Sequence, residues 1–378
     1  MFCASEAGKR SRKVLLLDHA NKAGKKILMS GGGRCNFTNY DVTPDKFLSH
    51  NPHFCKSALK SYTQWDFIAL VQKYHIPFHE KKLGQLFCDN KAKDILHLLL
   101  EECDNAGVDL RLNTSINAVN KIDDDLFQVN TSAGNLRCQS LVIATGGLSI
   151  PTMGATSFAY KIAEQFGVKV WPTSAGLVPF TLGPDDKKKY ATLSGVSFDA
   201  NVSYRNIAFD EGILITHRGL SGPAILQISS YWQPGGVVQI DTLPEINLYE
   251  VLVQLREKHR NQKLKSVLNS FLPKRVVEVF LDENMGNKTM QLFSHEQLKQ
   301  VQRIFQDWKI KPAGTEGYRT AEVTLGGIDC DAISSKTMET NAIKGLYFIG
   351  EALDVTGWLG GYNFQWAWSS AWAAGQVV

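Results

Sequence analysis

The C-terminal segment holds the residues whose types and spacing are most suggestive of chemistry. A short apolar run, Leu346–Ile349, leads into the acidic residues Glu351 and Asp354, and a helix rich in small residues follows. Four glycines punctuate this segment: Gly350, Gly357, Gly360 and Gly361. Glycines let backbone approach a flat, phosphate-bearing ligand closely, and a helix start offers free N–H groups and a positive dipole end. The pattern therefore suits a flavin, although a plain strand-to-helix connection with capping glycines explains it equally well.

A second glycine-rich segment lies near the N-terminus. Gly31, Gly32 and Gly33 stand between Ser30 and Arg34. Three consecutive glycines are poor in the interior of a helix or a strand, so we expect a loop that lies close to a ligand. It is not a phosphate-binding P-loop, because the Gly-Lys-Ser/Thr signature is absent.

Two apolar runs indicate buried parallel strands that end at polar or glycine-rich positions. Val14–Leu17 ends at Asp18, where a doubly wound sheet places the acid that bonds an adenosine ribose. A helix cap or a solvated turn explains Asp18 equally well. Leu141–Ile143 leads into Thr145 and Gly146, and glycine at a strand end again permits close approach to a ligand.

Composition limits the classes of function that remain. The chain has 378 residues, 44% hydrophobic and 21% charged, which fits a globular protein of two or three domains. A net charge of +4 is slight for this length, and no dense Lys/Arg stripe is visible in the sequence, so we expect no nucleic-acid partner. No apolar run is long enough to cross a membrane, and no membrane partner is expected.

Cysteine usage bears on location and on metal chemistry. Seven scattered cysteines form no Cys-x-x-Cys pair, which favours a reducing cytoplasm and argues against a structural metal site. The sequence therefore predicts a cytoplasmic protein that binds no metal.

The order of segments predicts an α/β protein in which an inserted portion interrupts the first domain. We expect residues 1–170 and 326–378 to form a Rossmann-like domain. In residues 171–247 and 316–325, apolar and polar residues alternate, which predicts a β-barrel-like insert. Residues 248–315 read as a helical insert, in which 248–281 and 295–308 are helices with basic outer faces.

Several segments together resemble one bacterial family, the BaiN/RdsA-type or YhiN-like flavoproteins, also described as NAD(P)/FAD-dependent oxidoreductases. The segments that carry the resemblance are Lys26–Asn39, Ile143–Gly147, Thr216–Pro223, Gly314–Thr324 and the block from Gly345 onward. Each is weak alone, but five in order along the chain are specific. The resemblance implies FAD as the prosthetic group and leaves the substrate open.

The resemblance also implies positions around the cofactor. It places Asp18 on the FAD ribose and Thr145 with Gly146 near the cofactor. Gly31, Gly32, Gly33, Arg34, Cys35 and Asn36 would lie near the isoalloxazine ring, and Ser30 would also bind the cofactor. The ribityl-phosphate region would contact Gly350, Glu351 and Asp354. The pyrimidine edge of the flavin would contact Gly361, Asn363 and Phe364 at a helix N-terminus.

One departure from the family pattern concerns the N-terminus. A domain of this kind opens with a buried strand and Gly-x-Gly-x-x-Gly, whereas this chain begins in the helix that should follow that turn. We therefore expect the chain to be truncated at its N-terminus, the alternative being that this shortened chain is the natural product.

The sequence predicts an FAD-dependent oxidoreductase that acts on a small organic substrate by hydride transfer at flavin N5. A non-catalytic flavin-associated factor and an inactive truncated remnant are the alternatives. Cys35 and His217 are the catalytic candidates, although a packed thiol and a structural hydrogen bond explain them at least as well. No second dinucleotide motif is present, so NAD(P)H would serve as a transient electron donor in the substrate cleft. The oligomeric state is left open.

Overall fold

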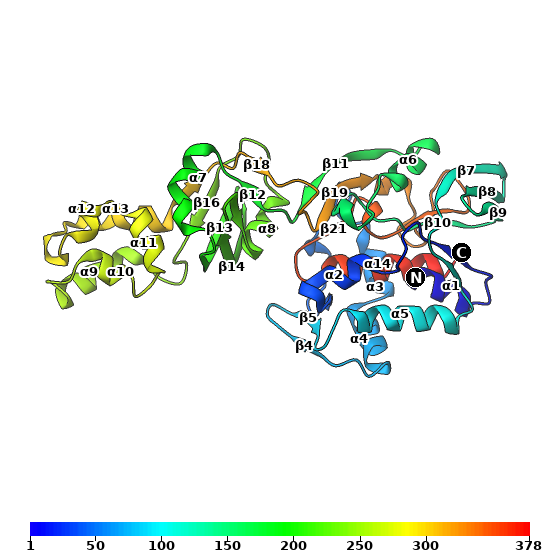
Figure 1. The fold of residues 1–378 in the computed structure, drawn as a ribbon, viewed down its shortest axis with the longest axis horizontal. Helices are drawn as coiled ribbons and strands as arrows, with labels where there is room; N and C mark the ends of the chain where they lie inside the picture. Colours follow the sequence, from blue (N-terminus) through cyan, green and yellow to red (C-terminus); the bar gives the residue numbers. More distant parts are fainter. The chain divides into compact units, whose positions relative to one another are not determined.

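The computed structural model describes residues 1–378 and divides into two compact units (Figure 1). Unit 1 comprises residues 1–174 and 323–378, and unit 2 comprises residues 175–322. Distant parts of the sequence therefore build unit 1, and unit 2 is inserted between them. The three-domain division expected from the sequence stays a prediction.

Unit 1 is a mixture of helices and short strands. Its helices are α1 (Phe2–Lys9), α2 (Lys25–Met29), α3 (Cys55–Ser61), α4 (Gln64–Lys73), α5 (Lys93–Asn105), α6 (Phe158–Gln165) and α14 (Tyr362–Gly375). Its strands are β1 (Leu15–Leu17), β2 (Asn36–Asn39), β3 (Phe47–Leu48), β4 (Phe78–Glu80), β5 (Gln85–Cys88), β6 (Asp109–Arg111), β7 (Ile116–Asp123), β8 (Leu126–Thr131), β9 (Gly134–Cys138), β10 (Leu141–Ile143), β11 (Val170–Gly176), β19 (Val323–Ile328), β20 (Leu346–Phe348) and β21 (Thr356–Gly357).

The parallel strands of unit 1 form two separate pairs. β1 pairs with β6, and Leu16 lies opposite Leu110. β10 pairs with β20, and Val142 lies opposite Tyr347. No strand of the structure joins the two pairs, so β1 and β10 each keep one edge without a ladder partner. The side chains of β1 are consequently half-buried, not fully buried as the apolar run predicts.

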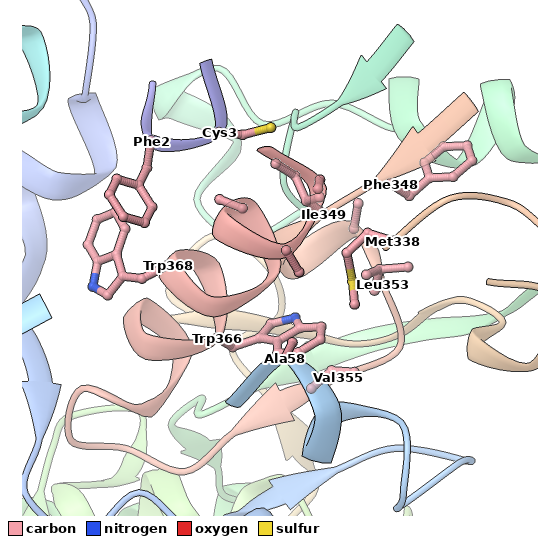
Figure 2. Packing of buried hydrophobic residues seen from close by; sticks show 14 of the residues in the cluster. Phe2, Cys3, Ala58, Met338, Phe348, Ile349, Leu353, Val355, Trp366 and Trp368 are labelled. Atoms are coloured by element: carbon pink, nitrogen blue, oxygen red, sulfur yellow. The ribbon is translucent and has the colours of Figure 1, made fainter. Parts of the chain in front are cut away.

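The core of unit 1 gathers around α14 (Figure 2). This helix is apolar on nearly all sides and almost entirely buried, as expected for a helix with neighbours all round it. Trp366 is 1% exposed, and the ring of Trp368 stacks on Phe67 with centroids 4.4 Å apart. The ring of Phe2, in α1, packs edge-to-face with Trp368, with ring centroids 5.9 Å apart. Burying each such side chain contributes about 1.5–3 kcal/mol, so these rings fix the helix that follows the C-terminal glycines.

Unit 2 combines an antiparallel sheet with a group of helices. Its strands are β12 (Phe180–Thr181), β13 (Ser197–Tyr204), β14 (Ile207–Ile215), β15 (Gly219–Ser221), β16 (Val238–Asp241), β17 (Trp308–Ile310) and β18 (Gly314–Thr315). Its helices are α7 (Pro184–Tyr190), α8 (Pro223–Ser229), α9 (Leu248–Lys258), α10 (Leu264–Leu268), α11 (Lys274–Phe280), α12 (Glu283–Asn287) and α13 (His295–Gln306). The strands form one open sheet in the order β17-β16-β13-β14-β15-β12-β18.

The helices from α9 to α13 all lie between β16 and β17 in the chain. Residues 248–281, expected as one helical stretch, form three helices instead. Pro273 caps α11, because proline has no N–H to donate within a helix. Residues 259–263 are not helical, and Lys263 forms an antiparallel β-bridge with Thr289.

Candidate functional site

The loop of three glycines turns back on itself between α2 and β2. Gly31, Gly32 and Gly33 have φ values of 57°, 66° and 86°, a region that favours glycine. The loop is anchored because the N–H of Ala92 donates to the Gly33 carbonyl at 2.7 Å. A Cβ on Gly32 or Gly33 would meet nothing within 4 Å. These two glycines therefore present bare backbone to open space, as a ligand-binding loop does.

The C-terminal glycines lie directly against the segment that follows this loop. Gly361 has φ 96°, and a Cβ there would collide with the carbonyl of Thr38. The side-chain amide of Asn39 donates to the carbonyl of Gly360 at 2.9 Å. With its amide in the orientation that satisfies both groups, Asn36 accepts from the Gly361 N–H at 3.1 Å. Loops more than 300 residues apart in sequence thus meet at the start of α14.

Asn363 holds the loop between Gly357 and the start of α14 through its side-chain hydrogen bonds. Its side-chain oxygen accepts from the N–H of Gly357 at 2.8 Å, and its amide donates to the carbonyl of the same residue at 2.8 Å. Phe364 is half-buried and stacks on Trp368 with centroids 5.5 Å apart. These contacts fix the loop shape and the start of the helix.

A carboxylate–ammonium pair joins three further segments. Glu351, just after β20, accepts from the ammonium of Lys26 at 2.7 Å. Its other oxygen accepts from the Ser149 hydroxyl at 2.9 Å and from the Thr324 N–H at 3.0 Å. Gly146 lies beside it, since a Cβ on that glycine would lie 3.9 Å from Glu351 Oε2. Thr145, the preceding residue, is exposed. Gly350 has φ 67° and open space where its Cβ would stand.

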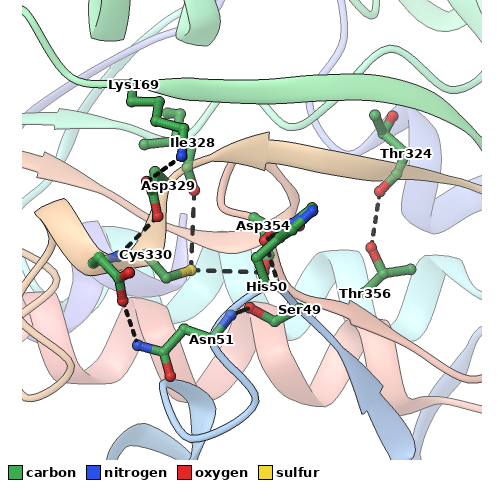
Figure 3. A network of polar contacts seen from close by, with 11 residues as sticks. Ser49, His50, Asn51, Lys169, Thr324, Ile328, Asp329, Cys330, Asp354 and Thr356 are labelled. Atoms are coloured by element: carbon green, nitrogen blue, oxygen red, sulfur yellow. Dashed lines mark hydrogen bonds and ion pairs between the residues drawn. The ribbon is translucent and has the colours of Figure 1, made fainter.

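Asp354 belongs to a separate polar network (Figure 3). Its carboxylate accepts from the backbone N–H of His50 at 2.8 Å and lies 2.8 Å from the Nδ1 of the same ring. The imidazole stacks on Trp171, with ring centroids 3.8 Å apart. Burial raises the pKa of Asp354, although the contacts with His50 act in the opposite direction. Asp354 therefore anchors the segment after β3.

Asp18 follows β1, as the sequence indicates. Its carboxylate is partly exposed and accepts from the N–H of Ala20 at 2.8 Å. The neighbouring His19 lies close to Gly154, whose Cβ would be 3.1 Å from the ring Nε2. The structure thus caps a turn with Asp18 and leaves part of the carboxylate accessible.

The two catalytic candidates occupy different environments. Cys35 is fully buried, and this burial raises the pKa of its thiol to about 12. That thiol therefore stays protonated, which favours the packed alternative. His217 is exposed in unit 2, in the turn between β14 and β15. A catalytic role for His217 stays a prediction.

The residues that converge in unit 1 fit a flat, negatively charged ligand. Open glycine backbone, the start of the 14-residue α14 and the ammonium of Lys26 all belong to this group. Helix starts and ammonium groups attract anionic groups, so the set fits the ring and ribityl end of a flavin. No Gly-x-Gly-x-x-Gly turn precedes a helix within residues 1–378.

Sequence reasoning assigned no role to Lys26, Ser149 and Thr324. All three lie in or beside segments that carry the family resemblance: Lys26 begins the stretch that holds the glycine loop, Ser149 follows the Thr-Gly-Gly turn, and Thr324 ends the stretch from Gly314. Their polarity gave no signal of a common partner, because only folding brings them to Glu351.

The fold and this site define a mixed α/β protein with a Rossmann-like FAD-binding domain, as the sequence predicts. The chain matches the family described as HI0933-like protein Rossmann domain over residues 1–377. It belongs to that family, and its class is the flavoprotein-type oxidoreductases.

Two curated relatives are similar over nearly the whole chain. The chain is 54% identical to the ribosomal RNA dihydrouridine synthase of Escherichia coli (strain K12), covering 100% of this chain and 94% of the relative. It is 50% identical to the ribosomal RNA dihydrouridine synthase of Haemophilus influenzae, covering 99% of this chain and 94% of the relative. A 3-dehydro-bile acid delta(4,6)-reductase of Clostridium scindens is 27% identical, covering 97% and 92%.

These matches correct two expectations. Truncation is not supported, because the chain covers 94% of the E. coli and H. influenzae relatives. The expectation of no nucleic-acid partner is wrong, since relatives 54% and 50% identical are named for ribosomal RNA. It rested on the slight net charge of the whole chain and on the absence of a dense Lys/Arg stripe, whereas residues 254–265 hold five cations and one acid.

The comparison with solved structures found partial similarity to oxidoreductases. A flavocytochrome c3 fumarate reductase has a TM-score of 0.47 and 18% identity, covering 99% of this chain and 75% of that chain. A 3-ketosteroid-Δ4-(5α)-dehydrogenase from Rhodococcus jostii has a TM-score of 0.43 and 13% identity, covering 99% and 94%. No helix of the structure has both the length and the apolar character needed to cross a membrane.

Proposed function

We propose that this protein is an FAD-dependent reductase that converts uridine to dihydrouridine in ribosomal RNA. The observation that carries the proposal is the pair of relatives named for this reaction, at 54% and 50% identity over nearly the whole chain. The site supports it, because the loops that would hold a flavin converge in unit 1. The small organic substrate expected from the sequence is thereby replaced by a nucleotide within an RNA.

The names of the relatives describe one type of chemistry. Uracil carries a C5–C6 double bond conjugated to a carbonyl, and a 3-dehydro-bile acid with Δ4,6 unsaturation is also an unsaturated ketone. Reduction of such a bond adds a hydride at the carbon remote from the carbonyl and a proton at the neighbouring carbon. In uridine the hydride would reach C6 and the proton C5. Bound FAD supplies the hydride in its reduced form.

The chain's own residues would bind and orient the reacting groups. The start of α14, fixed by Gly361 and Asn363, places the positive end of a helix dipole at the site, where it would stabilise developing negative charge. The ammonium of Lys26, which Glu351 holds in place at 2.7 Å, would offer a fixed hydrogen-bond donor. Gly32 and Gly33 would let the cofactor ring approach the backbone.

We infer that NAD(P)H supplies the electrons by binding transiently beside the flavin, because the chain carries no second dinucleotide motif. The reaction then balances as NAD(P)H, a proton and uridine giving NAD(P)⁺ and dihydrouridine. A cytoplasmic location fits this chemistry, and all seven cysteines are free thiols.

The test is nucleoside analysis of transcribed ribosomal RNA. The RNA carries no modification at the outset and is incubated with the full-length protein, FAD and NADPH. It is then digested to nucleosides and analysed by mass spectrometry. The proposal expects dihydrouridine at a defined site, recognised by the mass of two added hydrogens. Bound flavin without dihydrouridine under any donor would contradict it and favour a non-catalytic flavin-associated factor.

A further inference from the structure

A dense group of cations lies on the helical part of unit 2. Residues 254–265 contain five cations and one acid, Glu257, so this short stretch has the same net charge, +4, as the whole chain. Folding adds a sixth cation from a later segment. We call the following residues the basic surface: Arg256, Lys258, Arg260, Lys263, Lys265 and Lys288.

Backbone hydrogen bonds hold the two segments of the basic surface side by side. The N–H of Gln291 donates to the carbonyl of Arg260 at 3.0 Å, and the N–H of Leu264 donates to the carbonyl of Lys288 at 3.0 Å. The guanidinium of Arg256 also donates to the carbonyl of Phe293 at 3.1 Å. Cations separated by up to 32 positions in the sequence thus share one part of unit 2.

Most of these cations are not neutralised by acids. Arg256 pairs with Glu257 at 3.3 Å, but no ion pair joins Lys258, Arg260 or Lys263 to a carboxylate in the structure. All three of these residues are exposed. Lys187, Lys188 and Lys189 on α7 also have no ion pair with a carboxylate, but two acids, Asp185 and Asp186, directly precede them, so that stretch has a net charge of only +1.

We propose that the basic surface binds the phosphate backbone of the ribosomal RNA substrate. This inference rests on the proposed function, because the relatives' names supply RNA as the polyanion. Spaced, unpaired cations contact successive phosphates and bind through release of counterions. Only one strongly exposed apolar side chain, Leu292 at 60%, lies beside these cations, which is too little for the apolar centre of a protein interface. RNA is therefore favoured over an acidic protein.

The test uses a triple charge reversal, Lys258→Glu, Arg260→Glu and Lys263→Glu, in the full-length protein. Its matched control reverses three cations in the same unit: Lys187→Glu, Lys188→Glu and Lys189→Glu. Affinity for a fluorescein-labelled fragment of transcribed ribosomal RNA is measured from low to moderate salt. The surface variant is expected to bind at least about tenfold more weakly, and its salt slope is expected to fall by about two. The control is expected to stay within about threefold of the original protein.

Two further readouts separate this inference from the proposed function. The rate at which NADPH reduces the bound flavin should be the same in the surface variant, and its thermal unfolding should be unchanged. If the original protein makes dihydrouridine and the surface variant keeps full affinity and salt slope, the inference is overturned. Equal losses in the two triple variants would overturn it as well, since any three charges would then suffice. If the original protein makes no dihydrouridine, the proposed function fails, and with it the reason for choosing RNA.

Discussion

At the residue scale, Glu351 is the residue that connects the most segments of the candidate site. It receives hydrogen bonds from Lys26, Ser149 and Thr324, which come from three widely separated stretches of the chain. A carboxylate with partners on both oxygens is fixed in position, so it also fixes Lys26. The sequence indicated Glu351 because it follows a strand and a glycine, but its partners depend on tertiary structure.

Replacing Glu351 with Gln should weaken flavin binding. The amide cannot hold Lys26 as an ion pair, so the ammonium and the loop that carries Gly350 lose their fixed positions. We expect FAD to bind about tenfold more weakly, corresponding to the loss of a charge-assisted hydrogen bond. Quenching of flavin fluorescence during titration would measure this. Asp125→Asn, which breaks an exposed pair with Lys344, is the control, and an equal loss there would contradict the assignment.

The buried thiol of Cys35 gives a second prediction. Burial raises its pKa to about 12, so at neutral pH it is neither a thiolate nor accessible to solvent. We expect Cys35→Ala to keep dihydrouridine formation within about threefold, whereas loss of a catalytic acid or base costs about 100-fold or more. Native protein should also react with maleimide at the half-buried Cys138 before Cys35. A 100-fold loss in Cys35→Ala would restore Cys35 as a catalytic candidate.

At the scale of elements, the start of α14 shows why glycine stands where it does. Gly361 adopts φ 96° and packs against the carbonyl of Thr38, so the turn has room for no side chain. The sequence indicated the turn, because adjacent glycines before a small-residue helix are typical of one. It could not reveal the packing against β2, because that contact spans more than 300 residues.

Gly361→Ala should therefore destabilise unit 1 and reduce flavin retention. The methyl group meets a backbone carbonyl, and φ is also unfavourable for alanine, so we expect a loss of about 2–3 kcal/mol in the free energy of unfolding. Gly107→Ala is the matched control. It has φ 68° with nothing within 4 Å of the added Cβ, so only about 1 kcal/mol is expected. Urea unfolding gives both values, and equal losses would contradict the packing argument.

Three helices of unit 1 meet at one buried acid. Glu102 of α5 is 2% exposed and pairs with Lys9 of α1 and with Lys73 of α4, and the hydroxyl of Tyr74 also donates to it. Burial alone would raise the pKa of Glu102, but these three partners outweigh it and lower the pKa to about 2. This cluster could not be predicted from the sequence, because its members lie on separate helices.

The lowered pKa predicts how stability depends on pH. Because the pKa is about 4.3 in the unfolded chain, the contribution of Glu102 is complete above that pH and falls as the pH drops toward about 2. Glu102→Gln should cost about 2–3 kcal/mol near pH 7, with a difference that shrinks steadily below about pH 4. Glu101→Gln, at an exposed neighbouring position, should change little at any pH. A constant difference across this range would contradict the role given to Glu102.

At the scale of the whole molecule, the order of segments along the chain predicts the class of fold, whereas the net charge did not indicate the ribosomal RNA for which the relatives are named. The family match over residues 1–377 confirms the α/β fold class. The sequence could predict this class because strand-ending glycines and a small-residue helix are local patterns. The parallel pairs β1–β6 and β10–β20 lie in unit 1, although segments far apart in the sequence build them. The net charge of +4 averages over the whole chain and does not reveal that residues 254–265 alone carry +4. Folding adds Lys288 to these cations.

The central claim is that the loops around Gly32, Glu351 and Gly361 hold a flavin whose electrons pass to uridine in RNA. A single-turnover reoxidation experiment tests it most directly. The protein is loaded with FAD, reduced without oxygen, and mixed with transcribed ribosomal RNA or with polyadenylate as the control. We predict that the absorbance of oxidised flavin returns only with ribosomal RNA, and in proportion to the dihydrouridine formed. Flavin that stays reduced with ribosomal RNA, yet is reoxidised readily by oxygen, would contradict the claim.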